Sequence, residues 1–187
     1  MAFEGIRLGG PVDDVLAKGG ECRPGNATGE LARGTSSLLF AQNTFGYALS
    51  HHHAPRDSNA IHRALGVGTI CWATLGTDMR AFVGAVDRRV VAVIVYFWND
   101  GDFAAAVPAD SVRRRAYAAW GRPTHHASTL DTWSSRLYRS YFLVPQAPPA
   151  APAWVRAPRL IMLDIAACTA FDRRAHRAGA TGEVGAC

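Results

Sequence analysis

Lysine is almost absent from this chain of 187 residues. Lys18 is the only one, so the net charge of +5 rests on arginine. A preference for arginine beside abundant alanine, glycine and proline is typical of a GC-rich coding sequence and requires no selection for phosphate contacts. Charge alone therefore gives little support to nucleic-acid binding.

Long apolar runs are absent too. No stretch approaches the roughly 20 apolar residues of a transmembrane helix, and the first residues lack the basic region and apolar segment of a signal peptide. We expect a cytoplasmic protein with no membrane segment, although a processed form of an exported protein would look the same. The length fits a single α+β domain over residues 1–178, followed by a frayed tail at 179–187.

Cysteine is scarce and widely spaced. No two of the four cysteines form a C-x-x-C pair, which argues against a zinc knuckle and against a dense disulfide scaffold. Cys71 and Cys168 lie in apolar runs, so we expect ordinary buried thiols there. Cys71 also lacks the helix N-terminus or glycine-rich turn that activates a catalytic thiol.

The common nucleotide-binding and hydrolase motifs are missing as well. The chain has no G-x-G-x-x-G, no P-loop and no G-x-S-x-G. The glycine pairs Gly9-Gly10 and Gly19-Gly20 mark the two ends of a short helix. Asp13-Asp14 fits the first turn of that helix, where acidic side chains are favoured, better than a catalytic carboxylate pair. These features favour a non-enzymatic protein that needs no cofactor.

The sequence is, by contrast, rich in strand signals. The runs 70–75, 79–86 and 90–98 are dominated by β-branched and aromatic residues and are separated by turn signals at 76–78 and 87–89. This spacing predicts an antiparallel meander. In the third run both alternating sets are apolar, which is typical of a central strand that is covered on both faces.

The two predicted faces of this third run need separate covers. One face comprises Val91, Val93, Val95 and Phe97, and the other comprises Val90, Ala92, Ile94, Tyr96 and Trp98. The predicted helices suffice for one face only, and an open apolar face of this size would exceed what monomers normally expose. We therefore expect the second face to be closed by the segment 21–53 or by another subunit or partner.

Further elements complete the predicted fold. Strands are expected at 3–8, 129–133, 136–144 and 160–165, and helices at 11–18 and 111–120. The first helix begins at Pro11, and the second is capped by Asp110 or Ser111 and ends before Gly121. The inward positions of the first helix are Val12, Val15 and Leu16. We predict an α+β fold with a single antiparallel sheet of about five to seven strands and two main helices packed on one face.

Two places in the chain share a pattern. A short strand at 5–9 precedes the helix at 11–16, and the helix at 111–120 ends in Gly-x-Pro before Trp133 and a strand at 137–144. This pattern resembles the helix-plus-antiparallel-sheet modules of small bacterial proteins related to the β-lactamase-inhibitor protein and the small outer-membrane-assembly lipoproteins. The resemblance covers about half of the chain, which departs from it by lacking a lipoprotein signal and by its insert at 21–53. It implies a protein that binds other proteins and has no catalytic residues.

Aromatic residues and arginine offer a candidate binding surface. Tyr96 and Trp98 share one face of the third run, and Tyr138 shares a predicted exposed face with Arg136 and Ser140. Such surfaces are typical of protein-binding hot spots and of platforms for single-stranded nucleic acid. No RNA-binding core motif accompanies them. We therefore expect the partner to be another protein or a second copy of this chain, rather than nucleic acid or a membrane.

Histidines are the remaining candidates. Three consecutive histidines lie in a predicted loop, and neutral imidazoles bind zinc, nickel or copper. Adjacent histidines point in different directions, so a solvated loop is the favoured interpretation. If His51 and His53 belong to a metal site, the candidates for completing it are His125, His126, Asp57 and His62. The alternative function is thus a metal- or cysteine-dependent hydrolase centred on this loop, with Cys71 or the second histidine pair contributing.

Overall fold

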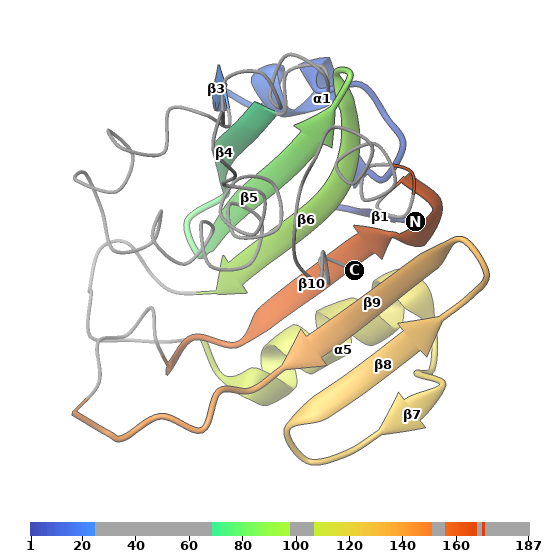
Figure 1. Cartoon of the computed structure of the whole chain (residues 1–187). Coiled ribbons are helices and arrows are strands. Elements are labelled where there is room, and N and C mark those ends of the chain that lie inside the picture. The colour runs from blue at the N-terminus through green and yellow to red at the C-terminus, as the bar shows by residue number, and fades with distance from the viewer. Residues whose placement is uncertain (25–68, 98–106, 151–155, 168–169, 171–187) are drawn as a thin grey trace, which may run out of the picture.

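The computed structural model describes residues 1–24, 69–97, 107–150, 156–167 and 170 (Figure 1). Within these residues the main sheet has eight strands, all paired antiparallel, in the order β3-β4-β5-β6-β10-β9-β8-β7. Its strands are β3 (Glu21–Pro24), β4 (Thr69–Leu75), β5 (Met79–Val86), β6 (Arg89–Phe97), β7 (His125–His126), β8 (Leu130–Ser134), β9 (Tyr138–Leu143) and β10 (Arg159–Asp164). A separate hairpin pairs β1 (Ala2–Phe3) with β2 (Ile6–Arg7), and the helices are α1 (Asp13–Leu16) and α5 (Ala109–Trp120), with a further helical turn at 165–167.

The predicted α+β class and the antiparallel sheet are confirmed, but the predicted number of strands is wrong. The main sheet has eight strands within the described residues instead of five to seven. Two of these, β3 and β7, are edge strands of four and two residues, which is too short for an alternating pattern to be recognised. The single strand expected at 3–8 is a hairpin, because Glu4 and Gly5 adopt φ angles of 48° and 77° that turn the chain back.

From each edge of the sheet toward its centre, the strands follow one another in chain order. In each half a helix precedes a four-strand meander: α1 precedes β3 to β6, and α5 precedes β7 to β10. The two meanders join where their last strands, β6 and β10, pair antiparallel. Figure 1 shows this junction in the middle of the sheet, with α5 behind β9 and β10. The fold is therefore two helix-and-meander halves that share one continuous sheet.

The main apolar core lies on one face of this sheet, which we call the helix face. Val15 of α1 and Val112 and Ala116 of α5 are buried in one cluster with the inward residues of the strands. Both helices therefore pack on the same face, as the sequence predicted. None of the helices in the described ranges has the length and apolar character needed to span a bilayer.

The longer helix, α5, ends where the sequence predicted but starts differently. Its end is at Gly121, whose N–H donates to the carbonyl oxygen of Tyr117 at 2.9 Å. Its start follows Pro108, and neither Asp110 nor Ser111 caps it. Proline needs no N–H partner at a helix entrance, so the chain can enter the helix here without a side-chain cap.

The shorter helix, α1, is a single turn rather than the predicted 11–18. Val12 and Val15 are buried as expected, whereas Leu16 is 42% exposed and its predicted inward position is wrong. One helical turn presents too narrow a face to bury three side chains. The segment before it is held by backbone pairing instead, and the N–H of Gly9 donates to the carbonyl oxygen of Val90 at 2.8 Å.

The alternation along β6 is interrupted near its start. The pairing with β5 moves from Gly84 opposite Ala92 to Ala85 opposite Val90, so Val91 is an extra residue in a β-bulge. Val90 therefore lies on the helix face with Val93, Val95 and Phe97, the set in which the sequence had placed Val91, and that grouping is corrected. Beyond the bulge the predicted alternation is confirmed, and the helix face takes Val93, Val95 and Phe97.

The opposite side of the sheet, which we call the second face, is also buried along β6. Ala92, Ile94 and Tyr96 form it and are at most 3% exposed. This double burial confirms that β6 is a central strand. The segment 21–53, which the sequence offers as one possible cover beside another subunit or partner, lies outside the described residues apart from β3.

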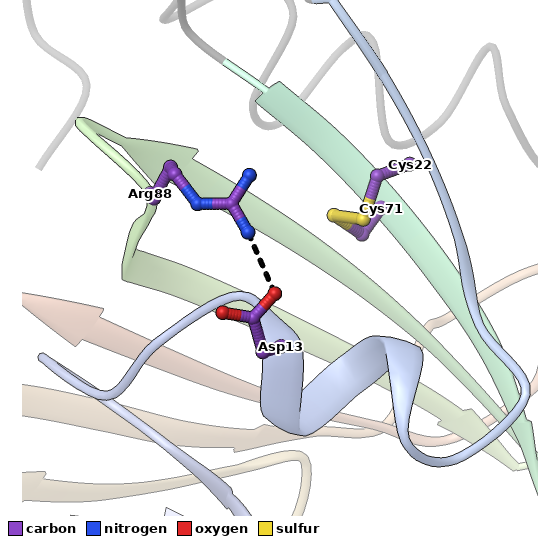
Figure 2. Close-up of a disulfide and its surroundings, with 4 residues drawn as sticks. All are labelled: Asp13, Cys22, Cys71 and Arg88. Atoms are coloured by element: carbon purple, nitrogen blue, oxygen red, sulfur yellow. Dashed lines mark hydrogen bonds and ion pairs between the residues drawn. A yellow bond between two sulfur atoms is a disulfide. The ribbon is translucent and has the colours of Figure 1, made fainter.

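A disulfide joins Cys22 of β3 to Cys71 of β4, two residues that lie directly opposite each other in the ladder (Figure 2). The expectation of a free thiol at Cys71 is therefore wrong. The cysteines are 49 positions apart in sequence, and only the pairing of the two strands brings them together.

Figure 2 also shows an ion pair between Asp13 of α1 and Arg88 of the β5–β6 turn. The distance between the carboxylate oxygen and the guanidinium nitrogen is 2.6 Å. Both of these side chains are largely exposed, so the ion pair adds at most about 1 kcal/mol.

The attachment of β3 depends on this disulfide. Each hydrogen bond of the short ladder contributes about 1 kcal/mol, and Pro24 lacks an N–H. Ordering the same residues costs about 1–2 kcal/mol each, so the ladder alone does not hold the strand. Closing a loop of this length raises the free energy of the unfolded chain by about 4 kcal/mol relative to the open chain.

Replacing both cysteines, by Cys22→Ala and Cys71→Ala, is expected to lower the free energy of unfolding by about 4 kcal/mol. Urea denaturation of the oxidised protein and of the double variant measures this difference. A reducing agent should destabilise the natural protein and leave the double variant unchanged. If reduction destabilised both proteins equally, the stabilising bond would not be the one between these cysteines.

Val95→Asp is expected to abolish folding, because a carboxylate at this fully buried core position has no partner to compensate its desolvation. The matched control is Leu137→Asp, since Leu137 is 55% exposed and its replacement should leave the protein folded. Near-ultraviolet circular dichroism and light scattering distinguish the two variants. A soluble, folded Val95→Asp protein of unchanged size would contradict the assignment of this face to the core.

Candidate functional site

The structure does not bring the predicted binding residues together. Tyr96 is buried on the second face of β6, with its ring 5.1 Å from the Arg159 guanidinium. Tyr138 belongs to β9 and packs against the helix-face core, so the two tyrosines lie on opposite sides of the sheet. Arg136 is exposed in the β8–β9 turn, and Trp98 lies outside the described residues. Of the members of this predicted set that the structure describes, Arg136 is the exposed one.

The predicted histidine ligands do not converge either. His51 and His53 lie outside the described residues. His125 and His126 form β7, where His125 lies opposite Thr132 and His126 lies opposite Asp131. Consecutive residues of a strand point to opposite faces, so these two side chains diverge. In the part of the chain that the structure describes, no group of three or more His, Cys, Asp or Glu side chains is placed to hold a metal ion.

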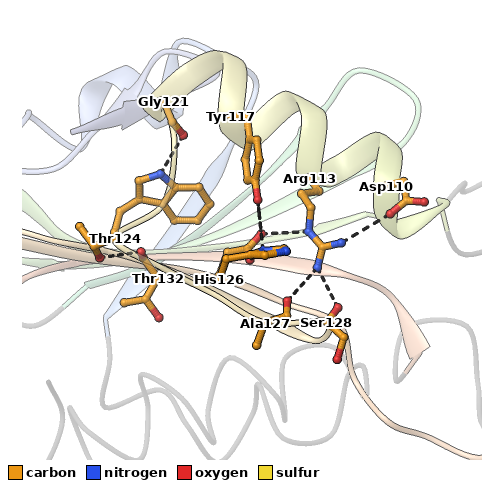
Figure 3. A network of polar contacts seen from close by, with 11 residues as sticks. Asp110, Arg113, Tyr117, Gly121, Thr124, His126, Ala127, Ser128 and Thr132 are labelled. Atoms are coloured by element: carbon orange, nitrogen blue, oxygen red, sulfur yellow. Dashed lines mark hydrogen bonds and ion pairs between the residues drawn. The ribbon is translucent and has the colours of Figure 1, made fainter.

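His126 instead joins a polar network on the helix face, centred on the buried carboxylate of Asp131. Figure 3 shows its partners Arg113, Tyr117 and His126. Asp131 is completely buried and accepts hydrogen bonds on both carboxylate oxygens. Oδ2 receives the Arg113 Nε–H at 2.9 Å and the Tyr117 hydroxyl at 3.2 Å, and Oδ1 bonds to Nδ1 of His126. Three side chains, two from α5 and one from β7, therefore meet at the carboxylate of Asp131 in β8.

Arg113 extends this network to the turn between β7 and β8. Its Nη2 donates to the carbonyl oxygens of Ala127 at 3.2 Å and Ser128 at 2.7 Å. Its guanidinium also lies 4.9 Å from the centre of the Phe142 ring, an arrangement that favours a cation–π contact. One arginine thus satisfies a buried carboxylate and two turn carbonyls, and it fixes α5 to the end of the sheet.

The electrostatics of the network are dominated by Asp131. Burial raises the pKa of its carboxyl group, but the hydrogen bonds from His126 and Arg113 and the positive charge of Arg113 outweigh burial. The pKa therefore lies below its ordinary value of 3.8. Burial, followed by the negative charge of Asp131, raises the pKa of the Tyr117 hydroxyl above its ordinary value of 10.0. The lowered pKa keeps Asp131 ionised at neutral pH, and the raised pKa keeps Tyr117 protonated.

This geometry holds His126 in the way that catalytic and metal-binding histidines are held. A carboxylate fixes one ring nitrogen and hence the orientation of the imidazole, whose side chain is 60% exposed. An oriented imidazole still requires further ligands or a nucleophile to act. Within the described residues it belongs to no group of three or more His, Cys, Asp or Glu side chains that could hold a metal ion, and Cys71 has no thiol to contribute because it is in the disulfide. The contacts of Arg113 and Tyr117 with Asp131 and His126 link α5 to the β7–β8 hairpin.

One signal in the sequence points to this network. Along β8, Asp131 and Trp133 share the buried face, so a carboxylate occupies a position where the alternation calls for an apolar side chain. A buried carboxylate needs charged or hydrogen-bonding partners. The partners Arg113 and Tyr117 are one helical turn apart on α5. Their meeting with β8 depends on how the helix packs.

The second face offers a different kind of site in the C-terminal half of the sheet. Partly exposed side chains gather there from β8, β9 and β10, and we call them the second-face patch: Leu130, Thr132, Tyr141, Leu143 and Ile161. The register supports this grouping, because Tyr141 lies opposite both Thr132 and Ile161. Exposed Arg139 and His125 belong to the same face. The patch combines an apolar centre with basic neighbours.

Comparison of the chain with models of protein families, with curated proteins and with solved structures finds no match. Its function is therefore argued from the geometry and chemistry of these sites.

Asp131→Asn is expected to lower the free energy of unfolding by about 3 kcal/mol, because it leaves the mostly buried Arg113 without its carboxylate. The matched control is Asp110→Asn. Asp110 also pairs with Arg113, at 3.5 Å, but is 81% exposed, so its loss should cost under about 1 kcal/mol. Thermal or urea denaturation at neutral pH compares the two variants. Equal effects would contradict a central role for Asp131.

The same pair of variants tests how the stability of the folded protein depends on pH. The folded-state pKa of Asp131 is lower than its unfolded value, so its contribution is present above about pH 4 and is lost as the pH falls through the folded pKa. The natural protein should therefore lose stability more steeply below pH 4 than Asp131→Asn does, whereas Asp110→Asn should follow the natural protein. Parallel acid profiles for all three proteins would contradict the depressed pKa.

Proposed function

We propose that this protein is a non-catalytic protein-binding module, inhibitor-like in its action, that uses the second-face patch and the β8–β9 turn. The observation that carries the proposal is a contrast within one sheet face. Ile94 and Tyr96 are buried in the N-terminal half of the second face, whereas Tyr141 and Ile161 remain partly exposed in the C-terminal half. Partly exposed aromatic and aliphatic side chains on a rigid ladder favour a contact surface.

The composition of the patch supports a protein partner. Tyrosine and arginine are enriched at protein interfaces, where a central aromatic anchor is surrounded by a polar rim. Tyr141 occupies the centre of the patch, because its neighbours across the ladders are Thr132 and Ile161. Exposed Arg139 lies next to Tyr138 along β9, and exposed Arg136 in the adjoining turn adds a second cation. The expected contact therefore has an apolar centre with arginines at its edge.

The charge of this region defines the chemistry of the partner. Between residues 121 and 150 the chain has three arginines and a single acidic residue, Asp131. Because Asp131 is buried on the helix face, it does not offset the positive charge of the second face. We therefore propose a partner protein whose contact surface is apolar and bordered by aspartate or glutamate. Complementary charge of this kind raises the rate of association and excludes basic partners.

The metal- or cysteine-dependent hydrolase is the weaker alternative. The histidines at 51–53 on which it is centred lie outside the described residues, and the disulfide occupies the sulfur of Cys71. The resemblance to the β-lactamase-inhibitor protein and the outer-membrane-assembly lipoproteins stays a prediction, as does the cytoplasmic location. The disulfide favours an oxidising compartment as the place where this module works.

Tyr141→Ala and Arg139→Glu are each expected to weaken capture of the partner by about tenfold or more, because they remove the central aromatic ring or reverse the charge at the edge. The assay compares proteins retained from a lysate of the source cell by the immobilised natural chain and by each variant. Leu16→Ala is the matched control, since this exposed leucine belongs to α1 and not to the patch. Capture that is specific to the natural chain and the control supports the proposal. Capture that is equal for all four chains, or that disappears after nuclease treatment, contradicts it.

A further inference from the structure

The edge of the sheet at β3 is held in an unusual way. Among the strands of the described residues, β3 pairs with β4 alone, through four residue pairs that run from Glu21 opposite Trp72 to Pro24 opposite Thr69. Within this ladder the disulfide links Cys22 and its direct neighbour across the ladder. The strand at the opposite edge, β7, is held without a covalent bond. The two edges of the sheet therefore differ, because the disulfide is at the β3 edge.

The surroundings of the disulfide place it between α1 and the edge. Cys71 is fully buried in the helix-face core, whereas Cys22 is only partly buried. Just before β3, Gly20 passes so close to α1 and β4 that a Cβ atom there would lie 2.6 Å from the carbonyl oxygen of Val15 and 2.9 Å from that of Trp72. This close approach holds the chain at Gly20, immediately before β3. The disulfide then holds Cys22, the second residue of β3, against β4.

We propose that the Cys22–Cys71 disulfide is a redox clasp for this sheet edge. Reduction by two electrons would release β3 from β4 and uncover the outer backbone edge of β4, while the C-terminal half of the sheet keeps its structure. An uncovered strand edge presents unpaired N–H and C=O groups that can pair with another strand. The oxidised form is then the closed form, suited to an oxidising compartment.

The exchange chemistry follows from the burial of the two sulfurs. An attacking thiolate of a dithiol reductant forms a mixed disulfide with the more accessible Cys22, and Cys71 leaves as a thiolate that takes up a proton. The second thiol of the reductant, as its thiolate, then displaces Cys22, which also leaves as a thiolate and takes up a proton. Two thiols on this chain and one disulfide on the reductant result. In the reverse direction a disulfide-containing oxidant accepts the two electrons and is itself reduced to a dithiol.

The proposal is independent of the proposed function, because the second-face patch belongs to the other half of the sheet. A reduced protein that has lost β3 should still bind through Tyr141. Failure of the clasp and failure of the binding surface are therefore distinguishable in separate measurements.

Amide hydrogen exchange of the full chain, oxidised and after reduction with dithiothreitol, tests the clasp. Reduction also stabilises the unfolded state and so accelerates exchange everywhere. The expected result is an additional loss of protection at residues 21–23 that exceeds the loss in β9 and β10 by about tenfold or more. The Cys22→Ser/Cys71→Ser double variant, measured without a reducing agent, should match the reduced natural protein at residues 21–23 and should not respond there to dithiothreitol.

Two outcomes would overturn the proposal. If protection fell by the same factor at 21–23 as in β9 and β10, the disulfide would act on global stability alone and would not release the edge. If peptide mapping of protein refolded with oxidised and reduced glutathione found Cys22 and Cys71 unpaired, the clasp would not form from a disulfide-containing oxidant.

Discussion

The pairing of β6 with β10 is the constraint on which the rest of the structure depends. Every residue of β6 after Arg89 is buried. A strand inside the protein cannot satisfy its backbone groups with water, so it needs a ladder on each side. β5 provides one ladder, and β10 provides the other, with Ile161 opposite Ile94 and Met162 opposite Val93. This contact joins two meanders into one sheet and places both helices over the same face.

The junction also explains why the two halves of the second face differ. Ile94 is fully buried while Ile161, its direct partner across the junction, is partly exposed. The change from interior to surface therefore takes place across a single pair of strands. The candidate binding surface begins on a ladder that is anchored in the core. A surface of this kind loses little conformational freedom when a partner binds, which favours affinity.

The two edges of the sheet are stabilised by different chemistry. At β3 a covalent bond substitutes for a ladder that is too short to hold the strand by itself. At β7 and β8 a buried carboxylate, Asp131, collects hydrogen bonds from α5 and from His126. Buried ion pairs add little net stability, but removal of one partner is costly, so such a network specifies one arrangement of helix and hairpin. The orientation of His126 follows from this structural role.

Local sequence determined the central meander, the end of α5 at Gly121 and the alternation of β6 beyond its bulge. These features depend on neighbouring residues, namely turn signals, a helix-ending glycine and a two-residue period. The number of strands, the disulfide, the Asp131 network and the second-face patch were decided by tertiary structure. Cys22 meets Cys71, and Arg113 meets Asp131, only after strand register and helix packing are set. Whether Tyr96 or Tyr141 reaches the surface depends on what covers each half of a shared face, and no pattern along a single strand contains that information.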